Sequence, residues 1–371
     1  MREDRNEGFI LVFIILLILI LSAFIAVGMA IVLNLQRSLK VSFDVNLKAD
    51  EIANAGIEDA ISWFKRQLTQ PVTVFSPKGP PDMPQENDTE DSTVGLVREY
   101  LISGNIYGRY EVPKSEVEDV SIRRGLTQTG SIWKITSYGY VFQKLDPNKK
   151  FNEAPNRILG QSKLSTEIRR VGVTLPMEAA ILAEKDVIIG TGGRIRGGIA
   201  TKGRVRVKET GDVQGTISEN QRMSLDSLSV FGLSMDELST LADISVSNVN
   251  ELPEKLPSSA LIYIDGNAQF GRDRPLNGGG ILIVNGNLNI QAGSNSNFTG
   301  LIYVVGNESS DYIQQAPSLI SGCLVVTGSV VNIQGTGEIS EIDYDKNIID
   351  MMKRRVGLYR RATPLIKEVN R

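Results

Sequence analysis

The longest pattern in the chain is an uninterrupted apolar run at residues 9–33, which contains no charged residue and Ser22 as its single hydroxyl. About 20 such residues cross the roughly 30 Å hydrocarbon core of a bilayer as a helix. A helix also satisfies its own backbone hydrogen bonds inside lipid. A cleaved secretory signal would have a shorter apolar core that ends at a small-residue cleavage site. The run is therefore interpreted as a retained transmembrane helix.

The pattern then becomes amphipathic, and its spacing predicts that the helix continues outside the membrane. Apolar residues recur at steps of three or four: Ile57, Ile61, Phe64 and Leu68. This spacing places them along one side of a helix. Gly56 costs a helix about 1 kcal/mol relative to alanine, which indicates a close contact there. Because Pro71 forbids continuation, we expect one helix from Phe9 to Leu68. The alternative is a single-pass anchor followed by a separate helix.

Residues 71–176 show a loop followed by strand patterns. Five prolines and an acidic cluster between Pro71 and Ser92 predict a solvated loop, and a short helix is expected at residues 93–102. Three later segments are strand candidates: Ile106–Val112, Ser131–Phe142 and Lys163–Leu175. Successive strands joined by loops predict an antiparallel meander. The outer half of the long helix is the expected cover for the apolar face of this sheet.

The second half of the chain contains an internal repeat of about 20 residues. Four segments superimpose, each a short apolar strand followed by a glycine turn: residues 261–267, 281–287, 301–307 and 323–329. Two weaker copies precede them, at residues 181–185 and 199–203. Short strands repeated at a fixed spacing are typical of a β-solenoid, in which each coil stacks on the next.

Residues at about 218–258 interrupt the repeat, and short helices are expected there, with Ser234 as an N-cap. The strong strands are apolar at both alternating positions, so their outer faces need cover. We expect the insertion, the antiparallel sheet or a C-terminal helix to lie against that flank. Residues 341–355 are expected to form a helix that caps the solenoid. The basic tail beyond it is interpreted as solvated, with contact to an acidic polymer as the alternative.

Composition and charge exclude several kinds of chemistry. The chain has 371 residues, with 40 basic and 43 acidic side chains and a formal net charge of −3, which gives no indication of nucleic-acid binding. There is no histidine, which argues against triads, zinc sites and imidazole proton transfer. The single cysteine excludes an intrachain disulfide.

No candidate catalytic group emerges from the repeat. Cys323 aligns with Leu261 and its equivalents, so a buried thiol is expected rather than a nucleophile. The ladder position of Asp265 carries no further carboxylate in later coils: Asn285, Val305 and Thr327 follow. Calcium requires six or more oxygen ligands, and no dense acidic loop is present. We expect no catalytic residue, no metal site and no cofactor.

A short polar leader that ends in Gly8, followed by Phe9 and a long apolar helix with an amphipathic second half, resembles a type IV prepilin. The stretch from Lys48 to Phe64 is similar to the Ala-Gly-x-x-x-Ala-x-x-Trp pattern of PilX-like minor pilins. The resemblance implies that prepilin peptidase cleaves after Gly8 and that Phe9 becomes N-methylated. A glycine-rich solenoid joined to such an N-terminus resembles large minor pilins as a whole.

The chain departs from the family pattern at Phe13, where major pilins carry a glutamate used in assembly. Minor pilins assigned to a filament tip commonly lack this acid. Basic residues flank both ends of the apolar run, so charge does not assign an orientation in the membrane. The orientation, with the C-terminal domains outside the cytoplasm, rests on the resemblance.

Together these observations predict an α+β fold: a long N-terminal transmembrane and amphipathic helix packed on an antiparallel pilin-like sheet, followed by a parallel β-solenoid. The expected boundaries are a leader, a transmembrane helix, its amphipathic continuation, the sheet domain, the solenoid, and a capping helix with a basic tail: residues 1–8, 9–33, 34–70, 71–176, 177–340 and 341–371.

The expected function is that of a minor pilin of a type IV pilus or related filament, working in assembly or priming, or at the tip in adhesion through the solenoid. The implied partners are other pilins through the N-terminal helix, prepilin peptidase, the inner membrane and a surface ligand or glycan at the solenoid, but no nucleic acid. The implied location is the bacterial inner membrane and then the pilus or cell surface. Two alternatives remain: a single-pass membrane-anchored solenoid scaffold, and a membrane-anchored enzyme acting on glycans.

Overall fold

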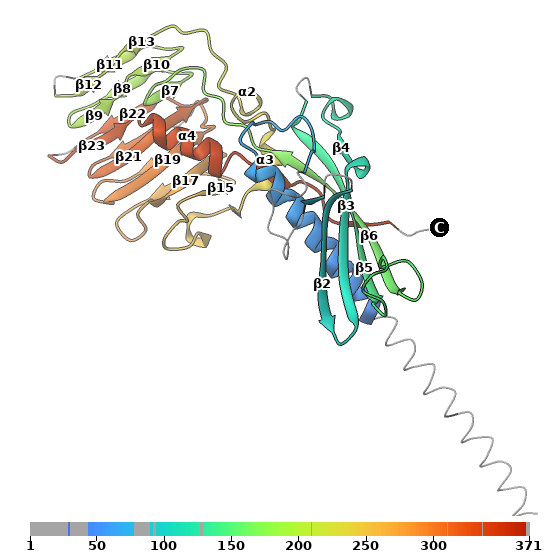
Figure 1. The fold of residues 1–371 in the computed structure, drawn as a ribbon. Coiled ribbons are helices and arrows are strands. Elements are labelled where there is room, and N and C mark those ends of the chain that lie inside the picture. The colour runs from blue at the N-terminus through green and yellow to red at the C-terminus, as the bar shows by residue number, and fades with distance from the viewer. Residues whose placement is uncertain are drawn as a thin grey trace, which may run out of the picture.

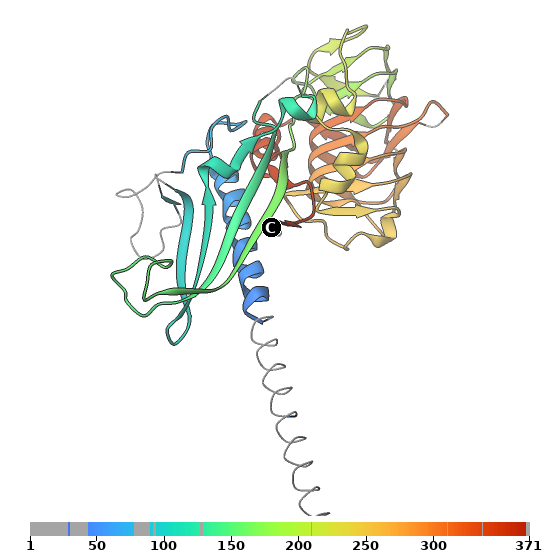
Figure 2. The same ribbon diagram turned by 90° about the vertical axis from the view of Figure 1, so that its right-hand side faces the viewer.

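The computed structural model describes the following residues: 29, 44–77, 90–91, 94–126, 129–208, 210–309, 311–335 and 337–368. They form two parts, an antiparallel sheet with a helix along it and a parallel β-solenoid (Figure 1). Figure 2 shows the helix along one face of the antiparallel sheet, with the solenoid beyond the end of the helix that residue 66 occupies.

The α+β fold class expected from the sequence, organised around a long transmembrane and amphipathic helix, is wrong. Most of the regular structure in the described residues is strand. No helix in that part of the chain is both long and apolar enough to cross a membrane. The expectation gave too much weight to the helix predicted at the N-terminus, and segments expected to be helix or tail, at residues 93–102, 341–343 and 359–367, contribute strands instead. Residues 9–33 lie outside the described residues except for Met29.

Residues 44–66 form a helix whose buried positions follow the predicted spacing. Ile57, Ile61 and Phe64 are buried, whereas Leu68, expected to be the fourth apolar position, is fully exposed beyond the end of the helix. The amide of Gln67 donates to Trp63 O at 2.9 Å, which satisfies one of the carbonyls left free at a helix C-terminus. The helix therefore ends slightly before the predicted residue.

The antiparallel sheet has the order β1-β2-β3-β5-β6-β24, with β4 beside β5 and β25 beside β6. Its strands are β1 (Glu90–Asp91), β2 (Gly95–Ser103), β3 (Ile106–Pro113), β4 (Val117–Asp119), β5 (Ile132–Gln143), β6 (Arg157–Arg170), β24 (Tyr359–Arg361) and β25 (Ile366–Lys367). Two 3-10 turns, η1 (Lys114–Glu116) and η2 (Ile122–Arg124), lie between them. The part of the meander formed by β3, β5 and β6 was predicted, with different ends for the last strand.

The helix expected at residues 93–102 is wrong, because that segment is strand β2. β2 forms a hairpin with β3, in which Leu96 pairs with Val112. Both side chains are buried under the helix of residues 44–66. Cross-strand pairing and burial decide the structure here, since local helix propensity is a weak preference that tertiary contacts override.

The solenoid is built from short parallel strands in two sheets. They are β7 (Ile181–Ala183), β8 (Val187–Ile189), β9 (Gly193–Arg196), β10 (Ile199–Thr201), β11 (Val205–Val207), β12 (Asp212–Gln214), β13 (Ile217–Ser218), β14 (Ile244–Val246), β15 (Ala260–Ile264), β16 (Ala268–Phe270), β17 (Asn277–Val284), β18 (Leu288–Ile290), β19 (Ser296–Val304), β20 (Tyr312–Gln315), β21 (Ser318–Val326), β22 (Val331–Gln334) and β23 (Ser340–Asp343). The predicted β-solenoid is confirmed, including the two weaker copies at β7 and β10.

The spatial order of the coils differs from their order in the chain. β7, the first strand, pairs in parallel with both β10 and β21, which belongs to the last repeat. Register is kept across this junction, since Leu324 lies opposite Ile181 and Val331 lies opposite Val187. The stack therefore ends at β13 on one side and at β14 on the other, although residues 219–243 join these two strands in sequence. The parallel sheet therefore continues from β21 to β7, although these two strands are not consecutive in the chain.

Three helices cover the outer flank of the solenoid: α2 (Ser227–Phe231), α3 (Met235–Leu241) and α4 (Lys346–Arg355). The 3-10 turn η3 (Val249–Glu251) instead adds Val249 to the cluster inside the solenoid. Ser234 caps α3 through a reciprocal capping box with Glu237, as its sequence predicted. Phe231, Leu238 and Met352 pack against the outward side chains of the strands. The expectation that the insertion or a C-terminal helix covers this flank is confirmed.

α4 does not cap an end of the solenoid, which corrects the sequence interpretation. It contacts β19 and β21 in the middle of the stack, and residues 340–343 before it form strand β23 rather than helix. Cys323 lies in register with Leu301 on the neighbouring coil and is buried under this cover. Burial raises the pKa of its thiol, so a nucleophilic thiolate is disfavoured there.

Candidate functional site

The helix of residues 44–66 contacts the antiparallel sheet closely enough that backbone meets backbone. A side chain at Gly139 of β5 would overlap Ala49 O and the backbone of Ala53. A side chain at Gly56 of the helix would overlap the Ser137 hydroxyl, so the close contact predicted at Gly56 is confirmed. We call this helix and the sheet of β1–β6, β24 and β25 the helix–sheet module.

An aromatic cluster fills the module at the end of the helix. The Phe64 ring lies 5.1 Å from the Trp133 ring, 5.6 Å from the Phe75 ring and 5.0 Å from the Tyr359 ring, measured between centroids. Trp63 meets Phe75 edge-on at 4.8 Å. Aromatic pairs at these separations add about 0.5–1.5 kcal/mol each beyond their buried area. The cluster therefore fixes the end of the helix against β5 and the C-terminal segment.

Tyr359 brings the C-terminus of the chain back into the module. Its side chain is fully buried, and it pairs with Arg170 in the antiparallel β24–β6 ladder. Its hydroxyl accepts a hydrogen bond from Val72 N at 2.9 Å and donates one to Gly130 O at 2.5 Å. Burial raises the pKa of Tyr359 to about 12, so the hydroxyl stays protonated and keeps its donor role.

Ion pairs join the returning C-terminus to the outside of the helix. Arg361 donates to Glu58 at 2.5 Å, and Lys367 donates to Asp50 at 2.8 Å. The expected solvated basic tail is therefore wrong for these residues, because they are paired with acids on the helix. The negative charges that attract them lie about 300 residues earlier in the chain, and only folding brings the two groups together.

The side of the helix away from the sheet is open and polar. Six residues on it are exposed, and one of them pairs with Arg361: Lys48, Glu51, Ala55, Glu58, Ser62 and Lys65. Their spacing of three, four or seven residues places them on one stripe. Among the described residues, Arg361 of β24 crosses this stripe at Glu58.

The module is joined to the solenoid by backbone and charged contacts. Gly172 N donates to Phe231 O at 3.0 Å and Thr174 N donates to Val230 O at 2.8 Å. Arg169 pairs with Glu237 of α3 beside a cavity of about 380 Å³. These contacts hold the insertion against the end of β6.

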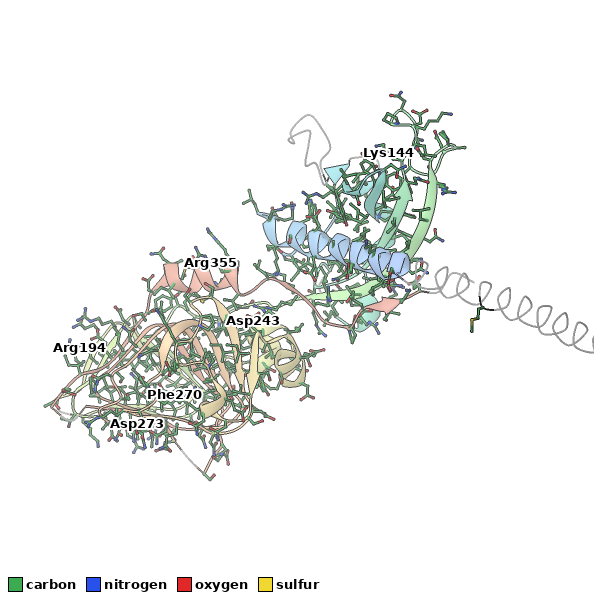
Figure 3. All side chains as sticks on the ribbon, turned by 90° about the horizontal axis from the view of Figure 1, so that it is seen from below. Lys144, Arg194, Asp243, Phe270, Asp273 and Arg355 are labelled. Atoms are coloured by element: carbon green, nitrogen blue, oxygen red, sulfur yellow. The ribbon has the colours of Figure 1, made fainter. Side chains whose placement is uncertain are left out.

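Asp243 forms a further charged contact in this junction, where Figure 3 labels it between the two parts. Its carboxylate pairs with the Arg360 guanidinium and accepts a hydrogen bond from Leu261 N at 2.8 Å. Burial opposes ionisation of Asp243, but the two donors outweigh it and hold its pKa below the usual value. The charged form of Asp243 therefore favours the joined arrangement.

The processing and assembly residues predicted from the sequence lie outside the described residues. These are Gly8, Phe9 and Phe13. Among the residues that the structure does describe, no group of three or more acidic or cysteine side chains is arranged to hold a metal ion. Asp265 accepts a hydrogen bond from the Asn285 amide at 2.9 Å on the next coil, the ladder neighbour that its sequence position predicted.

Sequence reasoning missed the residues that close the module. Tyr359 and Arg361 gave no strand signal, because β24 has only three residues. Gly139 carried a usable signal, since a glycine inside a strand marks close approach of another backbone. Nothing in the alternation of β5 indicated which segment approaches it.

No family model and no curated protein matches the chain. Among solved structures, the chain is similar to the crystal structure of the competence-associated pilin ComZ from Thermus thermophilus. That similarity covers 88% of this chain and 97% of the other, at 10% sequence identity and a TM-score of 0.19. At so low a score, the similarity carries none of the argument that follows.

Proposed function

We propose that the chain is a minor pilin of a type IV pilus or a related filament, of the PilX-like kind, and that it works in assembly or priming, or at the tip in adhesion. The observation that supports this is the packing of the helix of residues 44–66 along an antiparallel sheet through Gly56 and Gly139. The resemblance of the leader and of residues 48–64 to prepilins supplies the rest.

The arrangement supports a division of work between the two parts. The polar stripe of the helix, on the side away from the sheet, is available to neighbouring subunits. The solenoid lies beyond the opposite end of the module from residue 44, where it could contact a surface ligand or glycan (Figure 1). Phe13 in place of the usual acid fits a subunit with no other subunit ahead of it. The proposed mechanism is assembly, and no catalytic step is part of it.

The proposed partners are other pilins and prepilin peptidase. The proposed location is the bacterial inner membrane and then the pilus or cell surface. Both rest on the uncharged run at residues 9–33 and on the leader that ends at Gly8. A permanently anchored solenoid scaffold shares the described fold but keeps its leader, so the N-terminus separates the two functions.

Mass spectrometry of the chain isolated from cells with an active prepilin peptidase tests the proposal. We expect a mature protein that begins at Phe9 and carries one methyl group on its amine. Gly8→Leu should abolish cleavage, whereas Asn6→Leu, a matched change in the same leader, should leave it intact. An intact Met1, in cells that process their other prepilins, would contradict the proposal and leave the scaffold function.

A further inference from the structure

A basic cleft lies where the helix of residues 44–66 and α4 both end. Its volume is about 480 Å³, and five of the residues that line it are cationic: Lys65, Arg66, Arg170, Lys353 and Arg354. The other lining residues are polar or apolar, and none of the described carboxylates lines the cleft. The cations come from three segments far apart in sequence, so the tertiary fold concentrates them.

Most of these cations lack a partner of opposite charge. Within the part of the chain that the structure describes, Lys65, Arg170 and Arg354 form no ion pair. Lys65 lies near enough to Asp243 to lower the pKa of that carboxyl, but it does not pair with it. Lys353 lies 3.5 Å from Asp350, and both side chains are 42% exposed, which makes a weak pair. Arg66 is engaged within the protein.

The basic residues of the nearby C-terminal strands are paired with carboxylates, unlike most of those in the cleft. Arg360, Arg361 and Lys367 each contact a carboxylate that folding brings to them. The cations of the cleft lie close to these strands, but none of the described carboxylates lines the cleft, so their positive charges repel one another. An anion in the cleft would relieve that repulsion.

Arg170 differs from the other four cations because part of its guanidinium group is buried without a hydrogen-bond partner among the described residues. Its backbone N–H is bonded to Ser131 O at 2.9 Å, which fixes the end of β6. Its guanidinium Nε is buried and has no hydrogen-bond partner among the described residues. An unpartnered buried donor is costly, and more so on a charged group. Burial also lowers the pKa of this guanidinium, which is the expected response of a cation without a counter-charge.

A purely structural explanation accounts for only part of the cluster. Cations in the last turn of a helix interact favourably with its dipole, which explains Lys65 and Arg66 on one helix and Lys353 and Arg354 on the other. Arg170 is a strand residue that lies beside the same helix ends, so placement in the last turn of a helix does not explain its position. Three other arginines also have an unpartnered buried Nε, but each of them pairs with a carboxylate: Arg169, Arg360 and Arg361. Arg170 combines the unpartnered Nε with the lack of any paired carboxylate among the described residues, which favours an anionic ligand.

We propose that this cleft binds a phosphate group. Guanidinium groups present several N–H donors in a plane that matches a phosphate, and lysines add positive charge without a fixed direction. The cleft is larger than a single phosphate needs, so the group belongs either to a free polyphosphate or to a lipid headgroup. This inference stands independently of the proposed filament function.

Calorimetric titration of the full-length chain in detergent tests the proposal with two soluble compounds. Pyrophosphate represents free phosphate, and glycerophosphoglycerol represents the headgroup of phosphatidylglycerol. We expect saturable binding of at least one compound at low salt, weakening as the salt concentration rises. Binding of pyrophosphate alone assigns a free ligand, and binding of the phosphodiester assigns a lipid source.

Variants then locate the site. Arg354→Gln and Arg170→Gln should each weaken binding at least tenfold. Arg355→Gln is the matched control, because Arg355 follows Arg354 on α4, is also exposed and does not line the cleft; Figure 3 labels it on this helix. It should change binding less than twofold. Circular dichroism verifies folding, and Lys65→Gln, an exposed position, replaces Arg170→Gln if that variant unfolds.

Two results would overturn the proposal. One is the absence of saturable binding of both compounds to the unmodified chain. The other is an equal loss of binding in Arg354→Gln and Arg355→Gln, which would show a general charge effect rather than a site.

Discussion

The helix–sheet module and the solenoid both use glycine to bring two backbones together, but they use it differently. In the module, Gly56 on the helix, Gly139 on β5 and Gly160 on β6 each allow a separate contact between the helix and a strand, and each meets a different residue. In the solenoid, Gly280, Gly300 and Gly322 lie in register on adjacent coils, and all three have positive φ angles of 113°, 145° and 140°. Glycines needed on every coil recur at a fixed spacing in the sequence. A glycine needed at one contact does not recur, so the sequence does not show which segment it meets.

The two parts are also completed by segments that arrive from far away in the chain. The antiparallel sheet gains its last strand from Tyr359–Arg361, after the chain has passed through the whole solenoid. The solenoid gains its continuity from the pairing of β21 with β7. The module is closed by a short antiparallel ladder together with buried side chains, while the solenoid is closed by a parallel ladder in the register of the other coils. The comparison can be tested at both closures.

The largest effect is expected for the stacked glycines of the solenoid. A side chain at Gly300 would overlap Gly280 O on the neighbouring coil, in addition to the strain of its φ of +145°. Gly300→Ala should therefore lower the free energy of unfolding by about 3 kcal/mol or more. Chemical denaturation followed by circular dichroism measures it.

Gly232 provides the matched control for this substitution. It also has a positive φ, of +71°, but nothing lies within 4 Å of the position of its Cβ. Gly232→Ala should cost only about 1 kcal/mol, from backbone strain alone. Equal losses in the two variants would show that the approach of the coils is not what requires glycine.

A smaller effect is expected at the closure of the module. Tyr359→Phe removes the hydroxyl that bridges Val72 N and Gly130 O, and leaves both backbone groups buried without it. The free energy of unfolding should fall by about 2 kcal/mol. Hydrogen exchange at the Val72 amide should speed up at the same time, because that amide loses its acceptor.

Tyr100→Phe is the control for the loss of a tyrosine hydroxyl. Tyr100 lies on the same sheet and is 39% exposed, so its substitution should change stability by less than about 0.5 kcal/mol. A Tyr359→Phe variant as stable as Tyr100→Phe, with unchanged exchange at Val72, would mean that the aromatic ring alone holds the C-terminus.

The smallest effect concerns the charged junction between the two parts. The pKa of Asp243 is lower in the folded chain than in the unfolded one, so its contribution is present above the unfolded value of about 3.9 and is lost as the pH falls through the folded value. The pair is partly exposed, so the contribution is about 1 kcal/mol or less.

Unfolding of the native chain and of Asp243→Asn at pH 7 and pH 3 measures this contribution. Acidification should lower the stability of the native chain more than that of Asp243→Asn, because the variant has already lost the titrating group. Glu254→Gln, a change at a solenoid carboxylate that makes no ion pair among the described residues, should respond to pH as the native chain does. The same pH response in all three proteins would show that the ionised carboxylate of Asp243 does not stabilise the junction.

Much of the solenoid was predictable because its physics is local and repeated. The spacing of the glycine turns placed the strands, and the alignment of Cys323 with Leu301 gave the register that the structure shows. The apolar residues on both sides of each strand also predicted that the flank is covered. The order in which the coils stack could not be predicted from the repeat, because the strands of different coils have nearly the same pattern. β7 pairs with β21 as well as with β10.

The sequence predicted the outline of the module, but several details of that prediction were wrong. The spacing of Ile57, Ile61 and Phe64 located the buried side of the helix, and the meander followed from alternating strands. Residues 93–102 were assigned to a helix because their pairing with β3 is not visible locally. The overall α+β class failed for the same reason, since pairing turns short, weakly patterned segments into strands.

The sequence by itself determined the repeat, the register within it, the side of the helix that is buried and the absence of histidine chemistry, because each of these depends on residue type at a fixed spacing. Only the tertiary structure decided the order of the coils, the return of Tyr359 to the first sheet and the gathering of Lys65, Arg170 and Arg354 in one cleft. These features join residues more than 100 positions apart, and the energy of such contacts comes from burial and pairing that no local pattern records.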